Sequence, residues 1–464
     1  MRRSFGLILL LALLGAGLLA GGSFAVQRQG DQVVVTAETL AGDPSAAEGL
    51  TVNLPLVRGN CLHWDIAFPA DHPEQAVTEF SYATQEPSVP AFRDVPYLRL
   101  PFNYYAVTYY DGSWNDDLSS WDAMLTEAAA QVEAGTERTI SVLPAQYHTC
   151  WPLSVYALTD YEQPLRDTLA QLLASYFTIP IPEDYEVSLT IAKDDTGAIS
   201  SLTASSDPRY QYQAEGWSAD TPQGLLFTFC NYYEDFENTQ QVRLMDGSSI
   251  PGGWGIYRLT VDEARGRGSV ETVYTLPEGS QILDFRGVDD SSAFFLLTRE
   301  ADILRLRVFD SQPALQTTID LFSMKEGERY IQLYQGDDFL IPMLYGDDSG
   351  SWRLAVVASG SQGWQLDFTA DLEEQIALGC HYLTDSALSM DYQDGRLAIR
   401  GAHQRPGFYL AVYSQAGLEY LGVCATSLAP PAVQDTIADY EGQGYYALAQ
   451  GSPLPLVDWS ETAS

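Results

Sequence analysis

The sequence predicts a mainly β protein, in which an α+β N-terminal region with two amphipathic helices precedes a β-propeller-like C-terminal region of repeated three- to four-stranded units. One phrase recurs as YRLTV, LRLRV, WRLAV and FYLAV, starting at residues 257, 304, 352 and 408 and therefore at intervals of 47, 48 and 56 residues. Around each copy, short apolar runs alternate with turns rich in Gly, Asp and Ser, which is typical of short strands. Beyond residues 185–205 we find no helical pattern in this series.

A unit of this size cannot bury both faces of its sheet by itself. It must stack against copies of itself, which is the physical basis of repeat architectures. Strand repeats of ~40–50 residues are typical of propeller blades, whose radial packing also protects the sheet edges. We therefore expect at least four blades within residues 216–430. An irregular β-sandwich is the alternative architecture.

Residues 1–25 have the pattern of an export signal. Arginines follow Met1, an apolar run covers residues 5–20, and the small residues Ser23 and Ala25 precede a cleavage point after Ala25. The run is also long enough to remain in a bilayer as an N-terminal anchor. The stretch LLAGGS (18–23) resembles the signal of bacterial lipoproteins, with Gly22 in place of the lipid-bearing cysteine, and this resemblance implies bacterial export. We expect an extracytoplasmic protein, secreted or held at the membrane by this segment alone.

Residues 26–215 are predicted to form the α+β region. Strands are expected at QVVVTAETL (32–40), TEFSYA (78–83) and NYYAVTYY (103–110), and a hairpin is expected at residues 50–68. The first helix is expected at residues 120–134, with a capping box formed by Ser119 and Asp122. The second is expected at residues 164–176, with a proline in its first turn and leucines along one face. Both apolar stripes are expected to pack on a sheet.

The charge of the chain excludes several partners. It has 62 acidic and 24 basic residues, a net charge of −38, and only two lysines, Lys193 and Lys325. Such a chain repels phosphate backbones and anionic headgroups, so we expect no nucleic-acid binding and no electrostatic docking on membranes. The five cysteines are far apart and odd in number, which argues against a dense disulfide framework.

Three neighbourhoods combine cysteine with histidine, and zinc prefers those two ligands. They are Cys61 with His63, His148 with Cys150, and Cys380 with His381. These pairs have one or no intervening residue and lie in strand-like segments, whereas structural zinc sites usually draw on compact ligand knuckles, so buried cysteines beside hydrogen-bonded histidines are the favoured interpretation. Walker-type loops, GxGxxG, HExxH, CxxC and GxSxG are all missing from the sequence. We therefore assign no catalytic, cofactor-binding or metal-binding residue and expect no cofactor.

Two further stretches have a structural and a functional interpretation. GDDSGSW (346–352) resembles the Asp-box turn of sialidase-like propellers through Asp348, Gly350 and Trp352, and this resemblance implies only fold, because that turn is structural. The aromatic run at residues 103–114 could bind a sugar or a peptide, but tyrosine and tryptophan also fill half-buried strands. DGSWNDD (111–117) has oxygen ligands for calcium without the spacing of an EF-hand.

These patterns favour a non-catalytic binding or scaffold module of the bacterial envelope, whose partner is an envelope protein or a glycan. The alternative is an extracytoplasmic hydrolase that acts on glycans or peptides. A third hypothesis is an envelope sensor that retains residues 1–25 as its anchor. The Pro- and Gly-rich tail at residues 431–464 is either a linker or supplies a closing strand at GYYALA.

Overall fold

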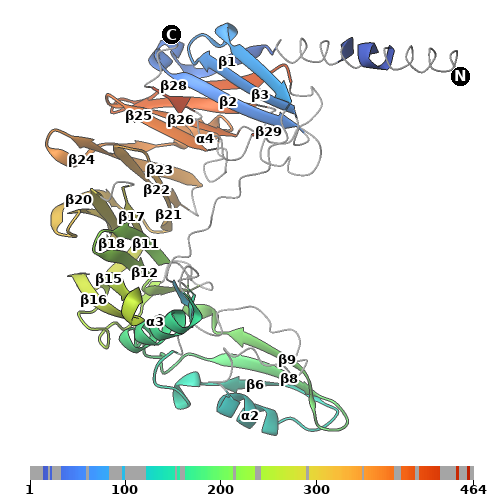
Figure 1. Cartoon of the computed structure of the whole chain (residues 1–464), viewed down its shortest axis with the longest axis vertical. Coiled ribbons are helices and arrows are strands. Elements are labelled where there is room, and N and C mark those ends of the chain that lie inside the picture. Colours follow the sequence, from blue (N-terminus) through green and yellow to red (C-terminus); the bar gives the residue numbers. More distant parts are fainter. Residues whose placement is uncertain are drawn as a thin grey trace, which may run out of the picture. The chain divides into compact units, whose positions relative to one another are not determined.

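The computed structural model describes residues 14–18, 21–22, 33–58, 62–82, 97–99, 122–151, 154–156, 162–212, 216–235, 242–288, 292–346, 350–380, 388–402, 407–428, 446–448 and 457–459. The chain divides into two compact units (Figure 1). The terminal unit comprises Met1–Ala91, Ile331–Tyr345 and Ser349–Ser464, and the middle unit comprises Phe92–Tyr330 and Gly346–Asp348. The structure is mainly β, with several four-stranded antiparallel sheets of the kind that forms propeller blades.

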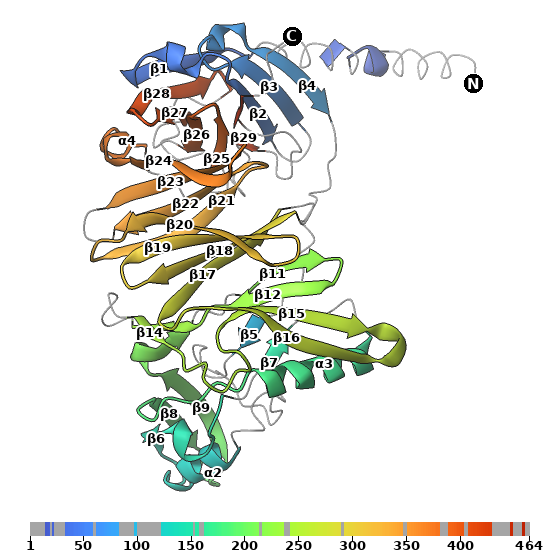
Figure 2. The ribbon, with the colours of Figure 1, turned by 90° about the vertical axis from the view of Figure 1, so that its left-hand side faces the viewer.

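The predicted repeats are four successive sheets with one strand order (Figure 2). The first is β11 (Gly216–Thr221), β12 (Gly224–Phe229), β15 (Gly255–Asp262) and β16 (Arg267–Thr275). The second is β17 (Ser280–Gly287), β18 (Ala293–Glu300), β19 (Ile303–Asp310) and β20 (Leu315–Ser323). The third is β21 (Glu328–Gln335), β22 (Phe339–Gly346), β23 (Ser351–Gly360) and β24 (Gly363–Asp371). The fourth is β25 (Ser389–Gln393), β26 (Arg396–Ala402), β27 (Phe408–Ser414) and β28 (Gly417–Thr426).

Every copy of the repeated phrase lies in the third strand of its sheet. The copies at 257, 304, 352 and 408 fall in β15, β19, β23 and β27, each between the second and fourth strands. One sequence pattern thus marks one structural position in four sheets. This regularity confirms the propeller-like prediction and does not fit an irregular sandwich.

Strand β27 shows why the phrase is so apolar. Its side chains alternate between two hydrophobic cores, because successive side chains of a strand point to opposite faces. Phe408, Leu410 and Val412 belong to a core shared with the N-terminal strands. Tyr409 and Ala411 belong to a core shared with β22 and β23. Both faces of this sheet are therefore buried against neighbouring sheets of the terminal unit.

The same packing occurs within the middle unit. One core combines Leu226 of β12 and Ile256 of β15 with Ile282, Phe294 and Phe309 of the β17–β20 sheet. Within each compact unit, neighbouring repeated sheets therefore bury their apolar faces on one another, and the expectation that the repeats stack is confirmed.

The predicted N-terminal strands and hairpin are present in the terminal unit. They are β1 (Val35–Gly42), the hairpin of β2 (Thr51–Arg58) and β3 (Leu62–Pro69), and β4 (Val77–Tyr82). The expected strand at 103–110 lies outside the described residues. Helical residues 14–18 and 21–22 lie within the predicted export signal, and among the described residues there is no helix both long and apolar enough to cross a membrane.

Both predicted helices are present in the middle unit. Helix α3 (Gln163–Tyr176) contacts β16 and buries Leu169 and Leu173. Helix α2 (Asp122–Ala130) is shorter than the expected 120–134, because Gln131 and Val132 bond to carbonyls only three residues back. It lies against the sheet of β6 (Glu137–Val142), β8 (Val187–Lys193) and β9 (Ile199–Ser206).

The middle unit also contains two smaller sheets. One pairs β5 (Tyr97–Arg99) with β7 (Ser154–Tyr156). The other joins β10 (Gln211–Tyr212), β13 (Tyr232–Glu234) and β14 (Val242–Leu244).

One helix was not expected. Helix α4 (Glu373–Ala377) follows β24, and its five residues are too few to show a helical period. Its Gln375 is wholly buried, donates to the Cys380 carbonyl at 3.0 Å and bonds to the Tyr413 hydroxyl at 3.1 Å. The buried amide of Gln375 therefore connects helix α4 to β27 through the Tyr413 hydroxyl.

Each end of the chain adds strands to the sheet of the other end (Figure 1). β1 pairs with β28, which extends the last repeated sheet. β29 (Tyr446–Leu448) and β30 (Val457–Asp458) pair with β2. The stretch GYYALA therefore contributes a strand, and three strand pairings connect residues from nearly opposite ends of the sequence.

Trp459 anchors the C-terminal pairing. Its backbone N–H donates to Asp391 Oδ2 at 2.6 Å, and its indole N–H donates to the Asp391 carbonyl at 3.3 Å. The Arg396 guanidinium lies 4.2 Å from the centre of the indole ring and donates to the carbonyls of Ala46 and Glu48. Three segments that are distant in sequence are thus joined around one buried ring.

We expect Trp459→Ala to destabilise the terminal unit by about 3–5 kcal/mol, because the buried ring loses its packing and leaves a cavity. Amide hydrogen exchange should show faster exchange in β2 and β25. Leu315→Ala is the control, since this side chain is 43% exposed and its loss should change stability by no more than about 0.5 kcal/mol. Wild-type protection of β2 in the Trp459 variant would contradict the anchoring role.

Candidate functional site

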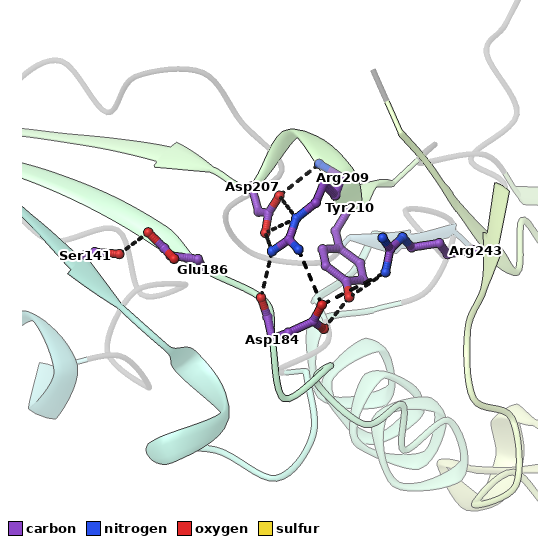
Figure 3. A network of polar contacts seen from close by, with 7 residues as sticks. All are labelled: Ser141, Asp184, Glu186, Asp207, Arg209, Tyr210 and Arg243. Atoms are coloured by element: carbon purple, nitrogen blue, oxygen red, sulfur yellow. Dashed lines mark hydrogen bonds and ion pairs between the residues drawn. The ribbon is translucent and has the colours of Figure 1, made fainter. Parts of the chain in front are cut away.

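The strongest candidate site is a polar cluster in the middle unit (Figure 3). We define the arginine–tyrosine cluster as Asp184, Asp207, Arg209, Tyr210 and Arg243. Asp184 precedes β8, Asp207 follows β9, and Arg243 lies in β14. Arg209 and Tyr210 belong to the 3-10 turn η5 (Pro208–Tyr210). Three loop or strand ends therefore converge on one place.

The Asp-Pro-Arg-Tyr stretch folds locally for a simple reason. The Asp207 carboxylate accepts the Arg209 backbone N–H at 2.9 Å, and the Asp207 carbonyl accepts the Tyr210 N–H at 3.1 Å. A side-chain cap at the first residue and a proline just after it favour such a turn. This turn holds Arg209 and Tyr210 side by side.

Asp207 fixes the guanidinium of Arg209. Arg209 Nε donates to both carboxylate oxygens, at 2.9 and 3.1 Å, and Nη2 donates to Oδ2. The Asp207 side chain is only 5% exposed, against 37% for Arg209. Burial by itself would raise the pKa of Asp207, but the hydrogen bonds from Arg209 and its charge outweigh burial and hold this pKa below its ordinary value. Asp207 is therefore a charged anchor.

The exposed side of the cluster is centred on Asp184, whose side chain is 57% exposed. Arg209 Nη1 lies 3.5 Å from Asp184 Oδ2, and Arg243 Nη1 lies 4.0 Å from the same oxygen. The Tyr210 hydroxyl donates to Asp184 Oδ1 and accepts from Arg243 Nη1 at 3.2 Å. Two guanidiniums and one hydroxyl thus converge on a single exposed carboxylate.

An aromatic layer supports this arrangement. The Tyr210 ring packs edge to face on Tyr185 and Tyr233, with ring centres 5.7 and 5.3 Å apart. Trp151 packs on Tyr185 and donates its indole N–H to the Tyr233 hydroxyl at 2.9 Å. Burial, together with the bond to Asp184, raises the pKa of Tyr210 to about 12. At neutral pH its hydroxyl is therefore a hydrogen-bond donor in a fixed position.

A second arginine cluster lies in the β17–β20 sheet and is less suited to binding. Glu300 accepts from both Arg305 and Arg307, and Arg307 is 5% exposed. Burial would raise the pKa of Glu300, but the bonds from the two arginines outweigh it and lower this pKa. Because the Glu300 carboxylate is already paired with both arginines, we interpret this cluster as one that stabilises the β17–β20 sheet rather than one that binds a partner.

The Cys–His neighbourhoods do not assemble a metal site in the described part of the chain, where no group of three or more His, Cys, Asp and Glu side chains is placed to hold an ion. Cys150 and Cys380 are free thiols, and burial raises the pKa of Cys380 to about 12. His63 is buried. Cys61 and His381 lie outside the described residues.

The other stretches singled out in the sequence are only partly described. Of the Asp-box-like stretch, Gly350 has a φ of +62° in the turn before β23 and Trp352 is buried, while Asp348 lies outside the described residues. The aromatic run at 103–114 and the calcium-type stretch at 111–117 also lie outside them. The arginine–tyrosine cluster was not predicted, because Asp184 and Arg243 are distant in sequence from the turn at Asp207–Tyr210 and the residues follow no motif.

Comparisons with known proteins do not identify a family: no family model matches the sequence, and no curated protein does. Similar solved structures include a post-proline cleaving enzyme from Rickettsia typhi, with 8% identity and a TM-score of 0.23 over 86% of this chain and 46% of that one. They also include a protein from Lactobacillus plantarum, with 10% identity and a TM-score of 0.25 over 59% of this chain and 75% of that one. The β-propeller domain of Vanderwaltozyma polyspora Nup133 has 8% identity and a TM-score of 0.20 over 86% of this chain and all of that domain.

The chain thus spans less than half the length of the Rickettsia enzyme. At these identities and TM-scores the likenesses carry no argument about activity. The propeller-like description rests on the strand order of the chain itself.

We expect Asp207→Asn to destabilise the protein at pH 7 by about 1–3 kcal/mol, because Arg209 loses a charged, buried partner. The pKa of Asp207 is lowered in the folded state, so its contribution is present above the ordinary value of 3.8 and is lost as the pH falls through the folded pKa. Thermal unfolding at several pH values should show the difference shrinking below pH 3.8. Asp184→Asn is the exposed control and should change stability little; a pH-independent deficit in Asp207→Asn would contradict the assignment.

Proposed function

We propose that this chain is an exported, non-catalytic binding module of a bacterial envelope, and that it recognises a carboxylate of its partner through the arginine–tyrosine cluster. One observation carries the proposal: two half-exposed arginines and a tyrosine hydroxyl converge on the exposed carboxylate of Asp184. Residues 1–25 support export.

Asp184 occupies the position that a partner's carboxylate would take. Exposed ion pairs contribute only about 0–1 kcal/mol, so Asp184 is displaced at little cost. A carboxylate placed between the two arginines gains charge-assisted hydrogen bonds, including one to Arg243, whose Nη1 is 4.0 Å from Asp184. Asp207 keeps the Arg209 guanidinium in place throughout.

The net charge of the chain restricts which partners can bind. A chain with a net charge of −38 repels strongly acidic molecules. Salt screens much of this repulsion from charges more than about 10 Å away. The group recognised is therefore a single carboxylate on a partner of low negative charge. A peptide C-terminus or an isolated acidic sugar has this chemistry.

The cluster does not support the alternative of a hydrolase. General acid–base catalysis needs a group that titrates near the working pH. The pKa of Asp207 is lowered and the pKa of Tyr210 is raised, so both stay far from neutrality. The arrangement fits binding without proton transfer.

The binding proposal predicts that an acetylated tripeptide with uncharged side chains and a free C-terminal carboxylate binds more tightly than the same peptide with an amidated C-terminus. Arg243→Ala should weaken the free acid about tenfold or more, because a charged hydrogen bond is lost. Asp184→Asn should strengthen it by removing the internal competitor. Isothermal titration calorimetry measures both effects.

The matched control is Arg265→Ala, since Arg265 is 69% exposed and pairs with Asp262 in a separate turn. It should bind the peptide as the wild type does. Equal affinity for the acid and the amide, or no effect of Arg243→Ala, would overturn the binding site. Recovery of the mature protein in the cytoplasmic fraction of a bacterial host would overturn export separately.

A further inference from the structure

A carboxylate lies beneath the last described strand of the chain. We define the C-terminal latch as residues 457–459, of which Val457 is wholly buried and Trp459 is 5% exposed. Asp391 of β25 is half-buried, and its Oδ2 accepts the backbone N–H of Trp459 at 2.6 Å. Its Oδ1 accepts the backbone N–H of Tyr392 at 2.9 Å. The carboxylate that binds the latch is therefore also one that the latch shields from water.

Two further carboxylates act on Asp391. Asp458 belongs to the latch itself, and Asp338 lies in the turn before β22. The negative charge of each opposes a negative charge on Asp391. The neighbouring Tyr392 points to the opposite face of its strand and donates its hydroxyl proton to Asp367 at 2.8 Å. The latch thus brings a carboxylate toward a place where two others already lie.

The cations on the same face of the sheet have other contacts. Asp391 pairs with Ala398 of β26, so Arg396 and Arg400, two residues to either side of Ala398, direct their side chains to the face of Asp391. Arg396 stacks on the indole ring of the latch and donates to two backbone carbonyls. The Arg400 guanidinium lies 4.6 Å from the centre of the Phe408 ring. In the part of the chain that the structure describes, neither arginine makes an ion pair with Asp391.

These surroundings set the direction in which pH acts. Burial raises the pKa of Asp391, the charges of Asp458 and Asp338 add to this effect, and together they outweigh the two backbone hydrogen bonds that lower it. When the latch leaves, Asp391 regains water and loses the nearby charge of Asp458, so its pKa returns toward the ordinary value of 3.8. Docking therefore tightens proton binding at Asp391. The matching stabilisation of the docked latch is fully present below pH 3.8 and is lost as the pH rises through the raised pKa.

We propose that the C-terminal latch is a pH-sensitive clasp, which holds β2 to β25 more firmly in acid and loosens as the pH rises. The clasp joins strands from the two ends of the chain, because β30 pairs with β2 while Trp459 bonds to Asp391. It works by the charge of one carboxylate under a buried ring and needs no covalent step. It is independent of the arginine–tyrosine cluster.

The test is amide hydrogen exchange of the full chain, followed by mass spectrometry at pH 4.5, 6 and 7.5, with exchange times corrected for the ordinary pH dependence of the reaction. In the wild type, protection of β2 and of the latch should be greater at pH 4.5 than at pH 7.5 by about threefold or more, since protonation strengthens docking by the factor by which docking strengthens proton binding. Asp391→Asn keeps an oxygen that accepts the Trp459 N–H but removes the charge. At pH 7.5 it should be protected at least as well as the wild type is at pH 4.5, and its protection should no longer depend on pH.

A second variant makes the test independent of any damage at residue 391. Asp338→Asn removes a charge that acts on Asp391 from outside the latch, and the Asp338 carbonyl keeps its bond from the Ser359 N–H. It should increase protection of the latch at pH 7.5, by less than Asp391→Asn does. The matched control is Asp371→Asn, since the Asp371 side chain is 69% exposed and pairs with Arg353, and it should keep the pH dependence of the wild type.

Three outcomes would overturn the clasp. One is wild-type protection of the latch that is equal at pH 4.5 and 7.5. Another is an Asp391→Asn protein that is folded by circular dichroism and either keeps the pH dependence of the wild type or protects the latch less at pH 7.5. The third is an Asp338→Asn protein whose latch is protected no better than that of the Asp371→Asn control.

Discussion

The structure depends on one constraint: a sheet of four strands has two faces, and neither can be left apolar and exposed. In the terminal unit β27 meets this constraint by sending Leu410 into one core and Tyr409 into the other. In the middle unit the first two repeated sheets share a core in the same way. Because the sheets repeat one strand order, a sheet can pack against a neighbour of matching shape.

Much of this architecture could be predicted, because its signal is local and periodic. The phrase at WRLAV marks a strand buried on both sides, and four copies at near-constant intervals indicate stacking. Helix α3 shows its leucine stripe over fourteen residues, so its bounds were predicted almost to the residue. The export signal, by contrast, is inferred from the order of basic, apolar and small residues in 1–25.

The features that could not be predicted arise from contacts between distant residues or from very short segments. Helix α4 is too short for a period to show. β30 pairs with β2 through Val457 and Val52, and no sequence pattern in either segment predicts this pairing. Arg243 and Asp184 meet only because β14 and the loop before β8 are brought together in space.

The crossed pairing of the two chain ends sets the timing of folding. A ribosome releases this polypeptide from its amino end, so β2 emerges hundreds of residues before β29 and β30 are available to cover its edge. Until then that edge presents unpaired backbone groups, which invite association with other chains. A nascent molecule therefore needs protection along β2 for most of its synthesis.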